Sequence, residues 1–162
     1  GVSSAASDVY KRQVSFQSLI LDMAGNVGTQ SLAVTIRVLM DETLTGRQKL
    51  ELVCKEGRIG LLNGLILGAA SCGVVGLYIM LFKAKTAAFA FGISGCIGVA
   101  LLLAMAVSSI VGTCVPLLFK KLGVDPAVAS GPLITTLNDL TAVVAYYGLA
   151  WLLLINTFGF GA

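Results

Sequence analysis

Apolar residues follow one another in long stretches along this chain, and most charged residues lie in the segments between them. Four such stretches cover about residues 15–40, 59–82, 86–119 and 125–158. Each is long enough to cross the hydrocarbon core of a bilayer as a helix, which takes roughly 20 residues. The pattern therefore predicts an all-α membrane protein, a polytopic helix bundle that lies in a lipid bilayer.

Several glycines and prolines predict breaks within these stretches. Residues 25–30 (GNVGTQ) put glycines and amides inside the first stretch and predict irregular backbone that lines a cavity. Gly112 and Pro116 predict a bend or a restart in the third stretch. In the fourth, Asp125-Pro126 predicts a helix start and Gly131-Pro132 a further break. The charged segment between the first two stretches is expected to be a loop.

Composition supports the membrane prediction and excludes several other classes. Hydrophobic residues make up 57% of the 162 residues and charged residues 12%, whereas a soluble domain carries about a quarter charged residues. The mean hydropathy is +0.93. The net charge of +3 is small and indicates no nucleic-acid partner. With 4 cysteines, no CxxC pair and no histidine, a zinc site or disulfide framework has little support.

The first residues differ in character from the rest. Residues 3–13 (SSAASDVYKRQ) resemble the in-frame translation of a transposase sequencing adapter, and such segments are left out of fold reasoning. We therefore expect residues 1–13 to be non-native and the natural sequence to begin near Val14. The alternative is a short polar leader, but an apolar segment of the right kind is missing before Val14.

The basic residues predict the orientation of the chain in the membrane. Lys83 and Lys85 fall on one side. The other side carries a larger set: Arg37, Arg47, Lys49, Lys55, Arg58, Lys120 and Lys121. By the positive-inside rule the larger set is cytosolic, so the first stretch runs inward and the C-terminus lies outside. A protein that starts in the cytosol then needs one more helix before Val14, and we expect that helix to be missing.

Small residues recur at every fourth position of the second stretch. They are Gly60, Gly64, Gly68, Cys72 and Gly76. Such a ridge lets a neighbouring helix backbone approach closely. The pattern predicts tight helix packing, and leaves open whether the partner lies in the same chain or in a second subunit.

Two acids, Asp22 and Asp139, lie in the interior of apolar stretches, whereas every natural Lys and Arg lies outside the hydrophobic cores. A charge at the bilayer centre costs at least about 2.5–3.5 kcal/mol, so Asp139 should be protonated, face water or meet a cation. Thr135, Thr136 and Asn138 add hydroxyl and amide oxygens close to it on a helix. Hydrated magnesium suits one carboxylate among such oxygens. The alternative is a protonated Asp139 that is hydrogen-bonded to a neighbouring helix.

The first stretch offers a second group of polar residues. Asp22 lies near its outer end, where recruiting an ion and simple solvation are equally good explanations. Exposed carbonyl groups of Gly25 and Gly28, together with Asn26 and Gln30, could hold the waters of a hydrated ion. A helix kink packed by a neighbouring helix explains the same residues.

Three motifs resemble the MgtE family of magnesium channels. Residues 22–31 (DMAGNVGTQS), followed by Ile36-Arg37, resemble the second transmembrane helix of that family. Residues 55–57 (KEG) with 60–64 (GLLNG) resemble the start of the third, and residues 122–127 (LGVDPA) with 132–141 (PLITTLNDLT) the fifth. The similarity covers about residues 16–155. Ser18, Ala24 and Gly131 depart from the residues usual in the family.

The resemblance implies a homodimer with five helices per subunit and a pore along the dimer axis, lined by the second and fifth helices. Four of the five helices would be present, in residues 14–162. The family's pore aspartate falls on Asp139, and Asn26 and Thr136 become further candidates for the ion site. The first helix and the cytosolic regulatory domains, including a CBS pair, would be missing. The implied location is the bacterial plasma membrane.

The function that follows is conduction of hydrated Mg²⁺ into the cytosol, with no enzymatic step. Ligand type does not separate Mg²⁺ from Mn²⁺ or Co²⁺, because all accept oxygen ligands. One alternative is a carrier or exporter in which Asp139 cycles a proton or a sodium ion. The other is a non-conducting assembly subunit in which Asp139 joins two helices.

Overall fold

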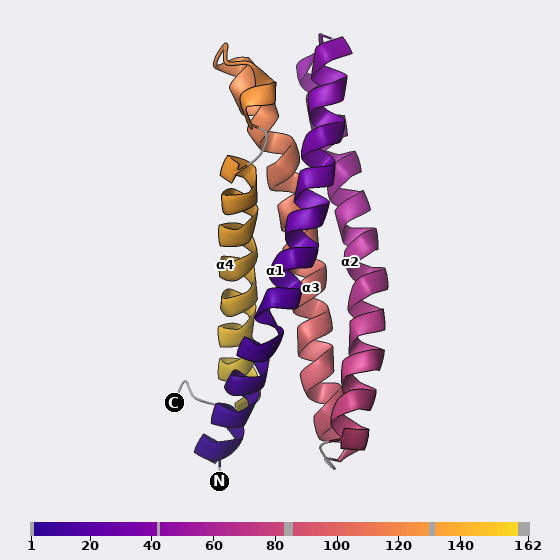
Figure 1. The fold of residues 1–162 in the computed structure, drawn as a ribbon, viewed down its shortest axis with the longest axis vertical. Helices are drawn as coiled ribbons and strands as arrows, with labels where there is room; N and C mark the ends of the chain where they lie inside the picture. Colours follow the sequence, from indigo (N-terminus) through magenta and orange to yellow (C-terminus); the bar gives the residue numbers. More distant parts are fainter. Residues whose placement is uncertain (1, 42, 83–85, 130–131, 159–162) are drawn as a thin grey trace.

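The computed structural model describes residues 2–41, 43–82, 86–129 and 132–158, and all long elements in these ranges are helices (Figure 1). In chain order they are α1 (Val2–Asp41), α2 (Gly46–Phe82), α3 (Ala87–Lys121), the short 3-10 helix η1 (Pro126–Ala129) and α4 (Pro132–Phe158). The described ranges contain no strand. The predicted all-α bundle is confirmed.

Helix α3 is the centre of the bundle. It packs against α1, α2 and α4, whereas α1 and α2 touch each other only slightly. The chain runs up and down, so that α1 begins and α4 ends near the lower end of the molecule (Figure 1). Sequence neighbours are therefore antiparallel, and α1 and α3 are parallel.

Two of the described helices, α2 and the part of α3 from Ala90 to Lys121, are long and apolar enough to cross a membrane. Their outer surfaces carry large apolar side chains, such as Leu65, Ile66 and Val74 on α2. A contiguous apolar surface of this kind suits lipid better than water.

Helix α1 is continuous through residues 25–30, so the predicted irregular backbone there is wrong. The Thr29 hydroxyl donates a hydrogen bond of 2.8 Å to the Gly25 carbonyl, one turn earlier. Carbonyl groups inside a regular helix already accept hydrogen bonds from the next turn. They are thus not the exposed acceptors that the glycine and amide pattern suggested.

Helix α3 continues through both Gly112 and Pro116, so of the bend or restart predicted there the restart does not occur. A proline inside a helix lacks the N–H that would bond to the carbonyl four residues earlier, which is that of Gly112. The helix ends at Lys121 in a Schellman motif: Val124 N–H donates to the Phe119 carbonyl and Gly123 N–H to that of Lys120. Gly123 has a φ of 74°, which this motif needs and glycine adopts without strain.

Helix α2 begins at Gly46, thirteen residues before the predicted start, so the expected charged loop is wrong. Thr45 and Gln48 form a capping box. The Gln48 side chain accepts a hydrogen bond of 2.8 Å from Thr45 N–H, and the Thr45 hydroxyl oxygen accepts from Gln48 N–H. Among described residues, only Thr43–Thr45 separate α1 from α2.

The fourth stretch divides into two helices. Asp125 caps the short η1 rather than an α-helix, through a hydrogen bond of 2.9 Å from Ala127 N–H to its carboxylate. The α-helical part starts only at Pro132. A break near this point was predicted, although Gly131 itself lies outside the described residues.

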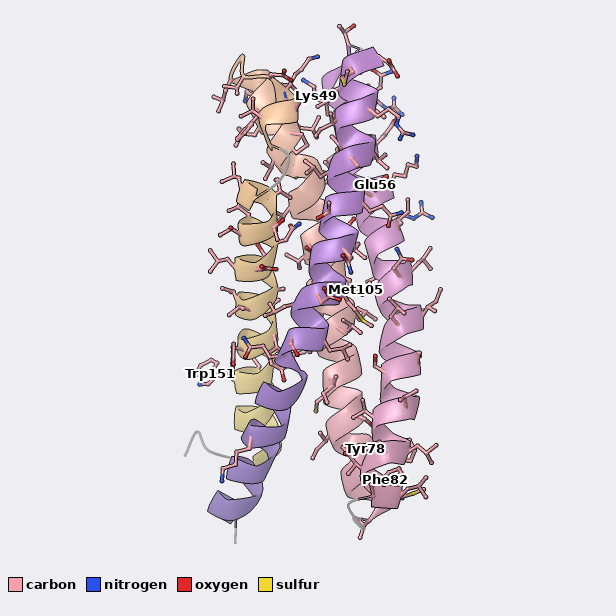
Figure 2. All side chains as sticks on the ribbon, in the orientation of Figure 1. Lys49, Glu56, Tyr78, Phe82, Met105 and Trp151 are labelled. Atoms are coloured by element: carbon pink, nitrogen blue, oxygen red, sulfur yellow. The ribbon has the colours of Figure 1, made fainter. Side chains whose placement is uncertain are left out.

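Most basic residues of the described chain lie at the upper end of the bundle. Arg37 lies near the end of α1, Lys120 and Lys121 end α3, and Arg47, Lys49, Lys55 and Arg58 lie in the first part of α2, whereas Lys11 and Arg12 lie near the start of α1. Figure 2 shows Lys49 and Glu56 toward this end, and Tyr78 and Phe82 near the opposite one. Lys120 also donates a hydrogen bond of 2.7 Å to the Leu39 carbonyl, which ties the end of α3 to the end of α1.

Helices α2 and α3 approach each other along the small residues of α2. A Cβ atom placed on Gly64 would lie 2.7 Å from Leu102 Cα, and one on Gly68 would lie 2.7 Å from the Gly98 carbonyl oxygen. One on Gly60 would lie 2.5 Å from Ser109 Cβ. The helix that contacts this ridge is therefore in the same chain.

Candidate functional site

Helices α1 and α4 run antiparallel and bring their polar residues together. Toward the lower end of the pair in Figure 1, the Tyr147 hydroxyl donates a hydrogen bond of 2.6 Å to Gln17 Oε1. Further in, a Cβ atom placed on Gly25 would lie 3.6 Å from Asp139 Oδ1, an ordinary contact distance. The Asp139 carboxylate thus lies directly against the α1 backbone, at the glycine beside Asn26.

Oxygen-bearing side chains form an exposed face around this contact, which we call the polar face. Asp22, Asn26, Thr29 and Gln30 are exposed on α1, and the first three repeat at helical spacing on one side. On α4, Asp139 is half-buried, and two exposed threonines lie within one turn of it: Thr135 and Thr136. The polar face is unusual in a bundle whose other exposed side chains are mainly large and apolar.

Asp139 has no ion-pair partner within the part of the chain that the structure describes. Arg47 and Glu51 form an ion pair across 3.0 Å, but they lie on the exposed first turns of α2. The Asp139 carboxylate is half-buried at the polar face, and no neighbouring lysine or arginine of the described chain neutralises it, so it can attract a cation.

Two residues predicted along the ion path, Gly28 and Asn138, lie inside the helix packing instead. Asn138 is 0% exposed, and neither its amide nitrogen nor its amide oxygen has a hydrogen-bond partner. The side chain fills the space beside Gly28, where a Cβ atom would lie 2.6 Å from Asn138 Cγ. Gly25 is half-buried and lies beside the polar face.

The polar face can hold a hydrated cation better than a bare one. Among the described residues, no group of three or more histidine, cysteine, aspartate or glutamate side chains is placed to hold a metal ion. The donor set is instead one carboxylate with amide and hydroxyl oxygens. Magnesium gives up its waters reluctantly and commonly binds through one or two carboxylates. The donor set suits an ion that keeps most of its water shell.

The structure also shows a buried polar cluster that sequence reasoning missed. Ser109 on α3 donates a hydrogen bond of 2.6 Å to the Glu56 carbonyl on α2. Its oxygen lies 2.6 Å from the Ser31 hydroxyl of α1. Because Ser109 has only one hydroxyl hydrogen, Ser31 is the donor in the second bond. One hydroxyl group therefore connects three helices.

Glu56 belongs to this buried region, although its position in a charged segment predicted a loop. Its side chain is 2% exposed. A signal was present in the sequence: Leu52 and Glu56 extend the four-residue spacing of Gly60 and Gly64 toward the start of α2. That spacing places Glu56 on the packed side of the helix.

Fold and polar face together define the class of this molecule, a helical integral membrane protein with carboxylate, amide and hydroxyl side chains exposed on two of its helices. The family model described as MgtE, a divalent cation transporter, matches residues 17–149. This range includes both helices of the polar face. The chain belongs to the MgtE family of divalent cation transporters, which are membrane transporters and not enzymes.

Three curated relatives are similar to this chain. The magnesium transporter MgtE of Enterococcus faecalis is 41% identical over 135 residues, which is 83% of this chain and 28% of that protein. Its namesakes from Bacillus subtilis and Thermus thermophilus are 36% and 35% identical, over 83% and 84% of this chain. This chain spans 28% of the length of each relative.

Proposed function

We propose that the chain is the pore-forming part of a magnesium channel, in which two copies conduct hydrated Mg²⁺ into the cytosol. Residues 14–162 are the pore domain in this proposal, and cytosolic regulatory domains belong to the parent protein. Asp139 is the acid that attracts the ion, with Asn26 and Thr136 as nearby oxygen ligands. Thr135, Gln30 and Asp22 lie further along the same path.

The polar face carries this proposal. The carboxylates and amides of the polar face are unfavourable against lipid, because nothing there replaces their hydrogen bonds to water. A second copy placed against α1 and α4 would remove them from lipid and bring two Asp139 carboxylates to one axis. All three relatives are named as magnesium transporters, which supports Mg²⁺ as the ion.

The inward direction follows from orientation and voltage. With the basic end in the cytosol, Asp22 lies on the outer side of Asp139 along the polar face. The membrane potential is worth about 2.3 kcal/mol per charge per 100 mV, and a divalent ion gains twice this on moving inward. No coupling ion is needed for such a flux. The bacterial plasma membrane is the proposed location, with the C-terminal end outside.

The test is Mg²⁺ influx into liposomes that contain the full chain, compared with Asp139→Asn. Asparagine keeps the size and the hydrogen-bonding capacity of the side chain but removes its charge. We expect influx to be lost while the variant still forms dimers of unchanged thermal stability. The matched control is Glu51→Gln, which removes an exposed carboxylate in a surface ion pair worth at most about 1 kcal/mol.

Each alternative function gives a different result in this experiment. Influx by Asp139→Asn equal to the original chain would contradict the ion site and favour an assembly subunit. Influx that collapses when a proton or sodium gradient is removed, at fixed voltage, would favour a coupled carrier. Competition by Mn²⁺ and Co²⁺ in the same liposomes measures the selectivity.

A further inference from the structure

The buried amide of Asn138 needs an explanation. Leaving a polar group without a hydrogen bond in the protein interior costs about 1–3 kcal/mol, and natural proteins contain few such groups. Asn138 immediately precedes Asp139 on α4, and both of its amide atoms are buried without a partner. A leucine would fill the same region without that cost.

The space that Asn138 occupies exists only because residue 28 is glycine. A Cβ atom on Gly28 would lie 2.7 Å from Asn138 Oδ1 and still closer to Nδ2. We call this space the Gly28 notch. Gly28 is held from the other side as well, because Gly112 of α3 packs against its carbonyl group, and a Cβ atom on Gly112 would lie 3.0 Å from Gly28 C. Three helices therefore meet at Gly28.

We infer that the Gly28 notch positions Asp139. A side chain seated in a notch fixes both the rotation of its helix and its height along the neighbouring helix. Residue 139 lies 100° further around α4 than residue 138. With Asn138 in the notch, the Asp139 carboxylate comes to lie against Gly25, at the edge of the polar face. Asn138 and Gly28 are positioning residues, and neither touches the ion.

This inference rests on the proposed function, since it explains how the acid of the ion site is oriented. It adds two residues that act through packing rather than by binding the ion. It also predicts that Gly28 and Gly112 differ in whether a second substitution can make room for an added Cβ. An added Cβ at Gly28 meets the end of a side chain, which a second substitution can shorten, whereas one at Gly112 meets backbone, which no substitution can remove.

The first experiment measures geometry without transport. In a full chain whose native cysteines (Cys54, Cys72, Cys96 and Cys114) are serine, cysteines replace Gly25 and Asp139. We expect these to form a disulfide, because a Cβ atom on residue 25 lies 3.6 Å from the end of the Asp139 side chain, so the two positions are side by side. Gly28→Ala should abolish the disulfide, and adding Asn138→Ala should restore it. Gly95→Ala is the control, since an added Cβ there meets nothing within 4 Å.

The second experiment measures Mg²⁺ influx in liposomes with native Asp139. Gly28→Ala should raise the Mg²⁺ concentration for half-maximal influx by about tenfold to a hundredfold, because misplacing a site by about 1 Å has effects of that size. Gly28→Ala with Asn138→Ala should recover most of this loss. A purely structural role would reduce the amount of folded protein and leave the half-maximal concentration unchanged.

Several results would overturn the inference. They are a normal disulfide in Gly28→Ala, no recovery in a folded double variant, or an unchanged half-maximal concentration. If Gly28→Ala fails to fold, the test is Asn138→Ala alone. This variant leaves the Gly28 notch empty and should also raise the Mg²⁺ concentration for half-maximal influx, so an unchanged value would overturn the inference. The disulfide results stand even if Asp139→Asn conducts normally, so failure of the proposed function and failure of the positioning are distinguishable.

Discussion

In a bundle with few polar contacts, the single hydroxyl group of Ser109 connects three helices. It accepts a hydrogen bond from Ser31 and donates one to the Glu56 carbonyl. The hydroxyls of Thr35 and Thr113 donate hydrogen bonds to carbonyls of the preceding turn, those of Ser31 and Ser109. The interhelical polar contact therefore depends on the two serines.

A double-mutant cycle on the serine pair tests this. We expect Ser31→Ala and Ser109→Ala to be destabilising, with a coupling energy of about 0.6 kcal/mol and at most about 1.7 kcal/mol, the mean and the maximum measured for hydrogen bonds between membrane helices. The measurement is the free energy of unfolding in detergent micelles of both single variants and the double variant. Strictly additive losses would show that the two hydroxyls do not interact.

At the scale of the helices, the bundle is built around close approach of α2 to α3. Without a water-driven hydrophobic effect between helices in lipid, association depends on van der Waals contact and on hydrogen bonds. Gly60, Gly64 and Gly68 permit the contact because their neighbours across the interface include backbone atoms of α3. Gly73, on the same helix, has nothing within 4 Å of an added Cβ.

The two classes of glycine should respond to alanine in opposite directions. Gly64→Ala forces the α3 backbone away and should destabilise the bundle by about 1–3 kcal/mol, as overpacking does. Gly73→Ala should be neutral or stabilising by up to about 1 kcal/mol, since alanine is the better helix former. Thermal unfolding of both variants in the same detergent provides the comparison. Equal midpoints would contradict the close α2–α3 contact.

On the scale of the whole molecule, charge and aromatic residues mark its two ends. Apart from Lys11 and Arg12 near the start of α1, the basic residues of α1, α2 and α3 collect at one end, and the stacked rings of Tyr78 and Phe82 lie near the other, 5.3 Å apart between centroids. Basic residues favour the cytosolic side, and aromatic residues are enriched at membrane interfaces. This polarity predicts one orientation in the membrane.

Thiol labelling can test that orientation. Cys54 is exposed near the basic end, between Val53 and Lys55. In a chain whose other cysteines are serine, a membrane-impermeant maleimide should label Cys54 in inside-out vesicles and leave it unlabelled in intact cells. A matched variant with Cys54→Ser and Phe82→Cys should give the reverse result. Labelling of Cys54 in intact cells would invert the proposed topology and the direction of ion entry.

Much of the architecture could be predicted from the sequence, because it depends on local properties of the chain. Long apolar stretches predicted the all-α bundle, and Asp139 stood out as an acid without a basic residue at its depth. Helix starts were harder. The sequence contains the capping-box pattern at Thr45 and Gln48, but the charged residues after it favoured a loop. In the structure α2 begins directly after Thr45.

What the sequence by itself determined is the class of structure and the presence of an isolated acid, since hydropathy and charge are carried by each residue wherever it lies. The tertiary structure alone decided which polar residues are exposed. Asn26 lies on the polar face, while Asn138, Gly28 and Glu56 are enclosed by neighbouring helices. It also kept α1 regular through residues 25–30. The physical reason is that burial and close approach depend on the shape of the neighbouring helix, which no local pattern contains.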